Sequence, residues 1–463
     1  MKNVETRGDG PLLRFARWAE AFIAAPLDAA IARHAKRAIL DWFAATYPGA
    51  DMPPARILER ALASTEGDGG RSTLLTSGRR TSVRTAALVN GVASHTAELD
   101  DIYREGIFHP GSPSIAAALA LGEHLDVPGD RFLRSVIVGY ELSNRVAANI
   151  QPAHYRFWHT TGTAGAFGAA TAAAVLLDLD AERHAHALAT AATMAAGLQQ
   201  AFRSDAMSKP LHAGHAADAG TLAALGAEHG YTGALDILEG AAGFGAAMSD
   251  APGWDACFDD LGTMFTIAAV TPKSHASCGH AFAPIDAALE LRAAGDLSSA
   301  QIVGVEVGTY RVATEVAGNP DPRTDFEAKF SIPFGVATAL VRGSVRLEAF
   351  RPEALTDTEV RRLVSSTRLV TDPELDGLFP NGRAARVRLE LSDGRVLETT
   401  RRTRKGDPDD PLTDDEMQAK YDELVAPSIG ADAARALSDR IWGLEGVTSL
   451  RDLLPLGAAT GGA

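Results

Sequence analysis

The first 270 residues repeat their apolar positions at the spacing of helices. Residues 15–24 and 27–47 carry apolar side chains every three or four positions, which places these side chains on one face of an α-helix. The same spacing recurs in alanine-rich stretches at residues 84–99, 114–125, 130–150, 162–177, 181–195 and 212–230. Alanine has the highest helix propensity and lets helices approach closely. We therefore predict an all-helical domain over about residues 1–270.

The pattern changes near residue 271. Residues 301–310 alternate valine with polar or small side chains, which predicts a strand. Residues 367–370 predict a second strand, and residues 385–400 predict a hairpin with an Asp-Gly turn. Helical spacing lies between these strands, at residues 280–292, 325–341 and 356–366. We predict a smaller α+β domain over residues 271–404.

The remaining segment, residues 405–463, returns to helical spacing. Residues 413–424 and 432–444 predict helices, and the first of them begins with a capping box from Thr413 to Glu416. We expect this segment to pack back on the helical domain. The predicted fold class is therefore mostly α with a smaller α+β domain.

The net charge and the cysteine content argue against several classes of function. A net charge of −15 at pH 7 argues against a nucleic-acid partner, because nucleic acids are bound by basic patches. No apolar run reaches the ~18 residues that span a bilayer, and the N-terminus has no signal-peptide core. We therefore expect a cytoplasmic protein without a membrane partner. Cys257 and Cys278 are too few for a disulfide framework or a four-thiolate iron–sulfur cluster.

One polar patch lies around a loop that follows a predicted helix. It contains His95, Glu98, Asp100, Asp101 and His109. Carboxylates beside histidines can perform general acid–base chemistry. The alternative for this patch is a solvated helix end with a cap for the next helix.

A second patch has His159 beside Thr160 and Thr163 at a helix start. An imidazole titrates near neutral pH and can act as a general acid or base, and backbone N–H groups at a helix start can hold a carboxylate. The alternative is a capping histidine.

A third patch has Lys209 just ahead of a predicted helix, with His212 and His215 three residues apart on one helix face. No carboxylate partner accompanies these histidines, so we expect no metal site and favour a lysine that binds an anion.

Two further patches lie in the predicted α+β domain. Lys273, His275, Cys278 and His280 come close together in the sequence, and Cys278 is either a reactive thiolate or a buried thiol at a domain junction. The other patch, residues 321–331, opens a helix; its basic residues could bind a carboxylate or form ordinary salt bridges. The sequence contains neither a phosphate-binding loop with Lys-Ser or Lys-Thr nor a Gly-x-Ser-x-Gly elbow.

Seven segments in this order resemble the MmgE/PrpD family, whose members include 2-methylcitrate dehydratase and cis-aconitate decarboxylase. They are ALVNG (87–91), ELDD (98–101), HPGS (109–112), HTTGTAGAFGAA (159–170), KPLHAGHAA (209–217), IDA (285–287) and EAKFS (327–331). The resemblance implies an all-helical domain with an α/β lid domain, a homodimer, a small polycarboxylate substrate and no cofactor.

The resemblance also implies site residues. The family's acid falls on Glu98 or Asp100, its two histidines on His109 and His159, and its lysine on Lys209. His159 or His109 would abstract or return a proton beside a carboxylate, and Lys209 would offset the charge that develops. We expect Asp100, His109, His159 and Lys209 to be catalytic. The residues expected to bind substrate are Glu98, Thr160, Thr163, Lys273, His275 and His280.

The chain departs from the family at several positions. Phe282 stands where the family often has a histidine, which argues against a standard 2-methylcitrate dehydratase. Glu98, Ile102 and residues 316–318 stand where the decarboxylase branch has an aspartate, a threonine and a tyrosine, which argues against a cis-aconitate decarboxylase. We therefore predict a divergent lyase of the dehydratase type. One alternative is an epimerase of an amino- or imino-dicarboxylate such as iminodisuccinate, and another is a catalytically dead dimeric binding protein.

Overall fold

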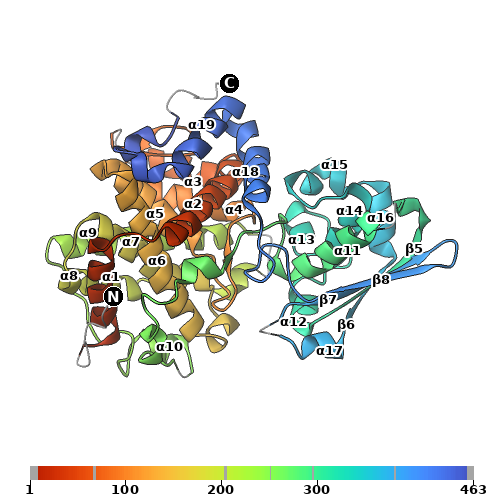
Figure 1. Ribbon diagram of the computed structural model, residues 1–463, viewed down its shortest axis with the longest axis horizontal. Coiled ribbons are helices and arrows are strands. Elements are labelled where there is room, and N and C mark those ends of the chain that lie inside the picture. The colour runs from red at the N-terminus through yellow and green to blue at the C-terminus, as the bar shows by residue number, and fades with distance from the viewer. Residues whose placement is uncertain are drawn as a thin grey trace. The chain divides into compact units, whose positions relative to one another are not determined.

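The chain forms two compact units (Figure 1). The structure is a computed structural model that describes residues 9–65, 69–202, 206–250, 252–294, 297–379 and 382–455. Unit 1 comprises Met1–Thr271 with Thr413–Ala463, and unit 2 comprises Pro272–Leu412. The expected boundaries are residues 270 and 404. The second lies later because residues 405–412 are bound to unit 2, where the backbone N–H of Lys405 donates to the Asp286 carboxylate.

Unit 1 is built around one buried helix, α7 (Thr160–Leu176). All of its residues are buried, and it packs against α5, α6, α8 and α9. The other helices of the unit are α1 (Pro11–Ala24), α2 (Ala29–Ala50), α3 (Pro53–Ala63), α4 (Val83–Thr96), α5 (Gly111–Leu125), α6 (Gly129–Asn149), α8 (Ala181–Ala192), α9 (Ser208–Glu228), α10 (Phe244–Met248), α18 (Asp414–Ile429) and α19 (Ala431–Trp442). The alanine-rich stretches thus form the predicted helices, and the predicted fold class is confirmed.

A glycine allows α7 and α9 to pack in close contact. A Cβ atom at Gly220 of α9 would lie 2.5 Å from the backbone nitrogen of Ala170 and 2.6 Å from the carbonyl oxygen of Ala166, both on α7. Neither backbone atom can move without shifting the helix. The small residue therefore sets the distance between two helices whose N-terminal ends carry His159 and Lys209.

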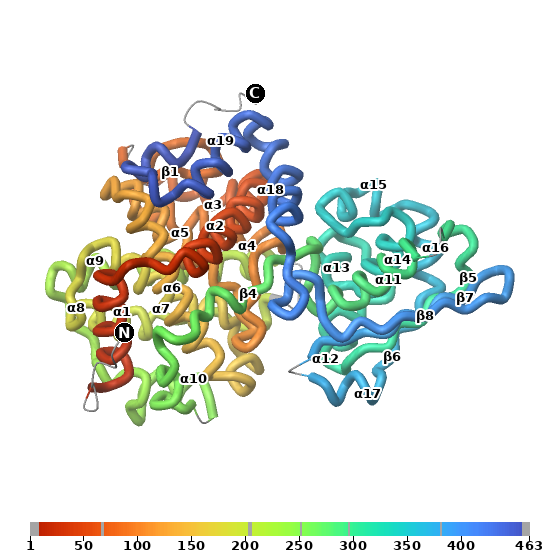
Figure 2. The backbone as a smooth tube through the Cα atoms, viewed as in Figure 1, coloured from red at the N-terminus to blue at the C-terminus, as the bar shows by residue number. Residues whose placement is uncertain are grey.

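The C-terminal helices return to unit 1. Figure 2 shows α18 alongside α2, and the two helices are in contact. Lys420 of α18 is buried and donates to Asp41 of α2 at 2.5 Å and to the carbonyl oxygen of Leu99 at 3.0 Å. Within the described residues, no helix combines the length and the apolar character that crossing a membrane requires.

Two short strand pairs in unit 1 are absent from the prediction. β1 (Ser72–Thr73) pairs with β2 (Arg80–Thr81), and β3 (Ile102–Tyr103) pairs with β4 (Val270–Thr271), both antiparallel. Strands of two residues are too short to show an alternating pattern. The β3–β4 pair fixes the loop that carries the first polar patch.

Unit 2 contains a four-stranded sheet with the order β6-β5-β7-β8. Its central strand β5 (Ile302–Thr309) is parallel to β6 (Thr367–Thr371) and antiparallel to β7 (Ala385–Leu391). β7 and β8 (Val396–Arg401) form the predicted hairpin, with Gly394 at a φ of 85° in the turn. The helices of this unit are α11 (Phe282–Ala294), α12 (Arg311–Val316), α13 (Asp325–Lys329), α14 (Ile332–Arg342), α15 (Pro352–Leu355), α16 (Thr358–Ser365) and α17 (Pro373–Asp376).

The prediction of one continuous helix over residues 325–341 is wrong. The segment divides into α13 and α14, and the Ser331 side chain caps α14 by accepting from the Phe334 backbone N–H. Pro333 explains the break, because proline has no N–H and fits only the first turn of a helix. The predicted start of α9 is also too late, since Pro210 is accommodated in a first turn that begins at Ser208.

Candidate active site

The loop between α4 and α5 gathers hydrogen-bond donors on one buried carboxylate. Asp100 Oδ2 lies 2.6 Å from Nδ1 of His95 and accepts from Ser112 Oγ at 2.9 Å. His109 Nδ1 lies 3.4 Å from the same oxygen. It also lies 2.8 Å from the carbonyl oxygen of Asp101, which can only accept, so His109 carries a proton on Nδ1. The predicted residues Asp100 and His109 are thus neighbours in the structure.

Asp101 holds this loop against α5 and α6. Its carboxylate accepts from Tyr140 Oη at 2.8 Å and from the Gly111 backbone N–H at 3.1 Å. Burial raises the pKa of Asp101 to about 7, and the nearby negative charges of Asp41 and Asp100 act in the same direction. The side chain is enclosed within the fold, and its backbone carbonyl orients the His109 ring.

Four imidazole rings follow one another through this part of unit 1. The ring centroids of His109 and His95 are 4.9 Å apart, those of His95 and His159 are 5.3 Å apart, and those of His159 and His212 are 5.2 Å apart. His159 precedes the first residue of α7, and its Nδ1 lies 3.0 Å from Nδ1 of His212 on α9. Sequence reasoning assigned no catalytic role to His95 or His212.

The environment of His159 favours a neutral ring. Burial lowers the pKa of His159 well below its usual value, and the neighbouring His95, His212 and His109 lower it further. Burial also lowers the pKa of His212, to about 4. Two neutral rings can share one proton between their Nδ1 atoms, and a neutral imidazole can act as a general base.

Lys209 and Glu98 form a buried ion pair. Each residue is only 5% exposed, and the lysine ammonium donates to Oε1 of the glutamate. Lys209 lies in the first turn of α9, where the helix dipole disfavours a positive charge, so the glutamate offsets this cost. Glu98 adopts a φ of 61°, a left-handed conformation that strains a residue other than glycine. Such strain is typical of functional sites.

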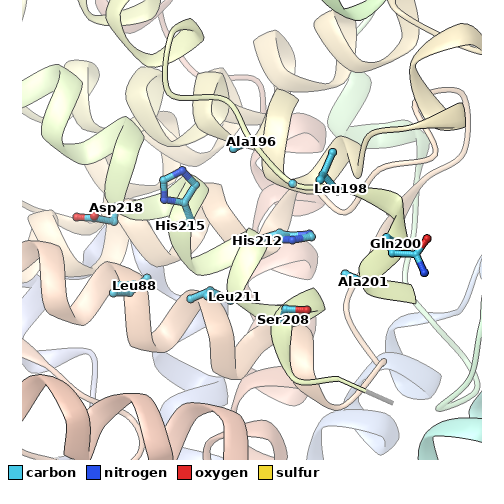
Figure 3. Close-up of a pocket in the computed structure, with 11 residues that line it drawn as sticks. Leu88, Ala196, Leu198, Gln200, Ala201, Ser208, Leu211, His212, His215 and Asp218 are labelled. Carbon is cyan, nitrogen blue, oxygen red and sulfur yellow. The ribbon is translucent and has the colours of Figure 1, made fainter. Parts of the chain in front are cut away.

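A pocket of about 700 Å³ opens beside this cluster (Figure 3). In Figure 3, Ser208, Leu211, His212 and His215 come from α9, and Leu198 lies on the facing segment. The remaining lining residues are Leu88, Ala196, Gly197, Gln200, Ala201 and Asp218. His212 therefore lines the pocket and also contacts the buried His159.

The two predicted threonines lie in the first turn of α7. Gln151 Nε2 donates to Thr160 Oγ1 at 3.0 Å, and Thr163 Oγ1 lies 2.8 Å from Nε2 of His154. His154 Nδ1 faces a carbonyl oxygen and therefore carries the ring proton, so its Nε2 accepts from the threonine. Both hydroxyls take part in contacts that stabilise the start of α7.

The other three predicted residues lie in unit 2, where Lys273 is buried. His275 Nε2 is 2.8 Å from Asp286 Oδ1, and its ring meets that of Phe282 edge-on. His280 Nδ1 is 2.6 Å from Tyr310 Oη, and burial lowers the pKa of His280 well below its usual value. Sequence reasoning missed Tyr310, which follows a strand.

Possible metal-ligand atoms of His95, Asp100 and His109 lie within 4.8 Å of one another, a spacing that would allow a metal site. Nδ1 of His109 carries a proton toward the Asp101 carbonyl oxygen, so this nitrogen is not a metal ligand. One Asp100 oxygen accepts from Ser112 and contacts His95. The three residues form a hydrogen-bonded acid–base cluster.

Comparison with known proteins identifies the family. The MmgE/PrpD N-terminal domain matches residues 13–256, and the MmgE/PrpD C-terminal domain matches residues 275–444. This chain belongs to the MmgE/PrpD family. The resemblance inferred from the seven sequence segments is confirmed.

Relatives of this chain have names that refer to one activity. A cis-aconitate decarboxylase-like protein, oryM, from Aspergillus oryzae is 27% identical, with 95% of each chain covered. Cis-aconitate decarboxylase from Aspergillus terreus is 25% identical over 95% of this chain and 94% of its own. The Homo sapiens cis-aconitate decarboxylase is 26% identical over 78% of this chain and 76% of its own. These relatives support a lyase-type activity in this family.

Proposed function

We propose that this chain is a lyase that acts on a small di- or tricarboxylate and moves a proton at the carbon beside a carboxylate. The observation that carries this proposal is the contrast between two histidines of one cluster. His159 is buried beside the His95 and His212 rings, whereas His109 lies 3.4 Å from the Asp100 carboxylate. Opposite environments of this kind separate a base from an acid.

The environments assign a role to each histidine. His159, whose pKa is lowered by burial, is neutral and acts as the base that takes the proton from carbon. The Asp100 carboxylate stabilises a positive charge on His109, so His109 acts as the acid that protonates the leaving group or the product carbon. Removal of the carbon-bound proton leaves an enolate-like charge on the adjacent carboxylate, and Lys209 offsets that charge.

Elimination of water from a hydroxy-polycarboxylate is the first reaction we propose, because breaking a C–O bond requires both an acid and a base. Glu98 and Ile102 support this choice, since they differ from the residues expected in the decarboxylase branch. Decarboxylation of cis-aconitate is the second candidate, because relatives that cover most of this chain bear that name. Both reactions require a proton donor or acceptor beside a carboxylate.

Product analysis by NMR tests the proposal. The unmodified protein is incubated separately with 2-methylcitrate, citrate and cis-aconitate. New olefin signals from a hydroxy-acid are the expected result, and loss of carbon dioxide from cis-aconitate supports the second candidate. Proton exchange without olefin or carbon dioxide indicates an epimerase and overturns the lyase assignment. Absence of any turnover or exchange overturns the proposed function.

A further inference from the structure

We propose that His212 is a proton relay between the buried His159 and the pocket beside α9. The proposal rests on the proposed function, because a relay is needed only if His159 exchanges a proton with substrate. Its structural basis is the 3.0 Å separation between the Nδ1 atoms of the two rings. His212 also lines the pocket of about 700 Å³ (Figure 3). One ring therefore contacts both the buried base and the pocket.

Two glycines allow the backbone to pack closely against the His212 side chain. A Cβ atom at Gly197 would lie 3.0 Å from Cγ and Nδ1 of His212, and a Cβ atom at Gly162 would lie 3.1 Å from the histidine Cβ. The carbonyl oxygen of Gly197 also accepts from the His159 backbone N–H at 2.9 Å. The same short segment thus binds the backbone of His159 and packs on the ring of His212, which fixes the contact between the rings.

The relay moves one proton and leaves both rings neutral. His159 accepts the substrate proton at Nε2 and gives the proton on its Nδ1 to Nδ1 of His212. His212 releases the proton on its Nε2 to a water molecule in the pocket. The bonds formed and broken balance, because each ring gains one N–H bond and loses one. When the reaction runs backward, the reverse sequence returns a proton from water to Nε2 of His159.

A relay suits His159 because the buried ring disfavours a positive charge. Its neighbours, the other imidazoles of the cluster, make that charge still less favourable. Passing the proton through a second neutral ring avoids forming an imidazolium inside the unit. The proton reaches water at His212, which is only partly buried.

The test uses two variants of neighbouring histidines. Asparagine in His212→Asn can keep a hydrogen bond near the Nδ1 position but cannot pass a proton through the side chain. The matched control is His215→Gln, because His215 lines the same pocket and its Nε2 faces the carbonyl oxygen of Met194 at 3.1 Å. Glutamine preserves that donor. Both proteins are assayed with the substrate that the unmodified enzyme turns over.

We expect His212→Asn to lower kcat by about 100-fold with little change in KM, as for loss of a general acid–base group. Added imidazole, which the pocket can admit, should restore part of kcat. For the control variant, kcat and KM should each stay within about twofold of the values of the unmodified enzyme. This difference is smaller than the thermal energy RT of ~0.6 kcal/mol. A His212→Asn kcat within the same twofold range overturns the relay, and so does a loss that imidazole fails to restore.

An NMR measurement separates failure of the relay from failure of the proposed function. In the resting protein with ¹⁵N-labelled histidine, the relay requires a proton shared between Nδ1 of His159 and Nδ1 of His212. A signal that connects the two nitrogens and disappears in His212→Asn supports the relay. Its absence overturns the relay even if the enzyme is active. Lack of turnover by the unmodified protein instead overturns the proposed function.

Discussion

The buried ion pair between Lys209 and Glu98 allows stability and catalysis to be measured separately. In Lys209→Met, the Glu98 carboxylate is left 5% exposed with its counter-charge removed. Loss of one partner of a buried ion pair destabilises a protein by about 3–5 kcal/mol. We expect a loss of about 3 kcal/mol, because Glu98 can be protonated and its strained backbone can relax. The Glu98→Gln variant should lose a similar amount.

The double variant, Glu98→Gln with Lys209→Met, leaves no buried charge at this position. We expect it to lose about 2 kcal/mol less than the sum of the single variants, because the two residues interact directly. Urea denaturation followed by tryptophan fluorescence measures this difference. All five tryptophans lie in unit 1, so the signal reports on the unit that contains the pair.

Enzyme activity distinguishes the Lys209–Glu98 ion pair from a buried ion pair that has no catalytic role. We expect Lys209→Met to lower kcat/KM by about 100-fold or more, because a donor to the developing negative charge is lost. The matched control is Arg145→Met, since Arg145 pairs with the buried Glu141 at 2.8 Å in the same unit. The control should lose comparable stability and keep its kcat. Additive stability changes, or a kcat/KM of Lys209→Met equal to that of the control, would refute the reasoning.

Three further predictions concern unit 1. For Asp101, whose folded-state pKa is about 7, stability is greatest below the unfolded pKa of about 4 and falls by up to about 4 kcal/mol as pH rises through 7. Asp101→Asn should remove this slope in urea denaturation at pH 4 to 8, and an unchanged slope would contradict the assignment. Gly220→Ala should destabilise unit 1 by about 1–3 kcal/mol, because the added Cβ atom would overlap the backbone of α7. In the control, Gly446→Ala, the added Cβ atom would have no neighbouring atom within 4 Å, so the melting temperature should stay unchanged. His109→Asn should keep a donor toward the Asp101 carbonyl oxygen yet lower kcat by about 100-fold; full activity would exclude His109 as the acid.

The periodic pattern of the sequence predicted most of the fold. Helices α4 to α9 coincide with the alanine-rich stretches, and the Asp-Gly turn of the β7–β8 hairpin was also predicted. The pattern failed where a single residue overrides it. Pro333 divides one predicted helix into two, and Pro210 is tolerated in the first turn of α9. Strands of two residues leave no periodic signal at all.

The site was predictable in part, because its residue types cluster at helix ends. Asp100 and His109 lie near each other in the sequence and are neighbours in the structure. The contact between His159 and His212 depends on how α7 packs against α9, across 53 positions of sequence. Spacing along the chain carries no information on such a contact. The helical spacing between Lys209 and His212 was the one signal that could have placed His212 near the site.

Contacts between residues of different elements in unit 2 were likewise not predictable from the sequence. The Tyr310 hydroxyl contacts His280, although the two residues belong to different elements. Phe282 packs edge-on against His275, which gives an apolar residue a structural role at a position where the family often has a histidine. Homodimer formation stays a prediction, and light scattering of the purified protein checks it.

Exchange of the substrate proton with solvent tests the central claim most directly. The protein is incubated in D2O with the polycarboxylate that it turns over, and deuterium at the carbon beside the carboxylate is followed by ¹H NMR. His159→Asn is compared with His186→Asn, which alters a histidine of α8 that contacts the Gly233 carbonyl oxygen. Circular dichroism establishes that both variants fold. The account predicts exchange in the unmodified protein and in His186→Asn and its loss in His159→Asn; equal exchange in all three would contradict it.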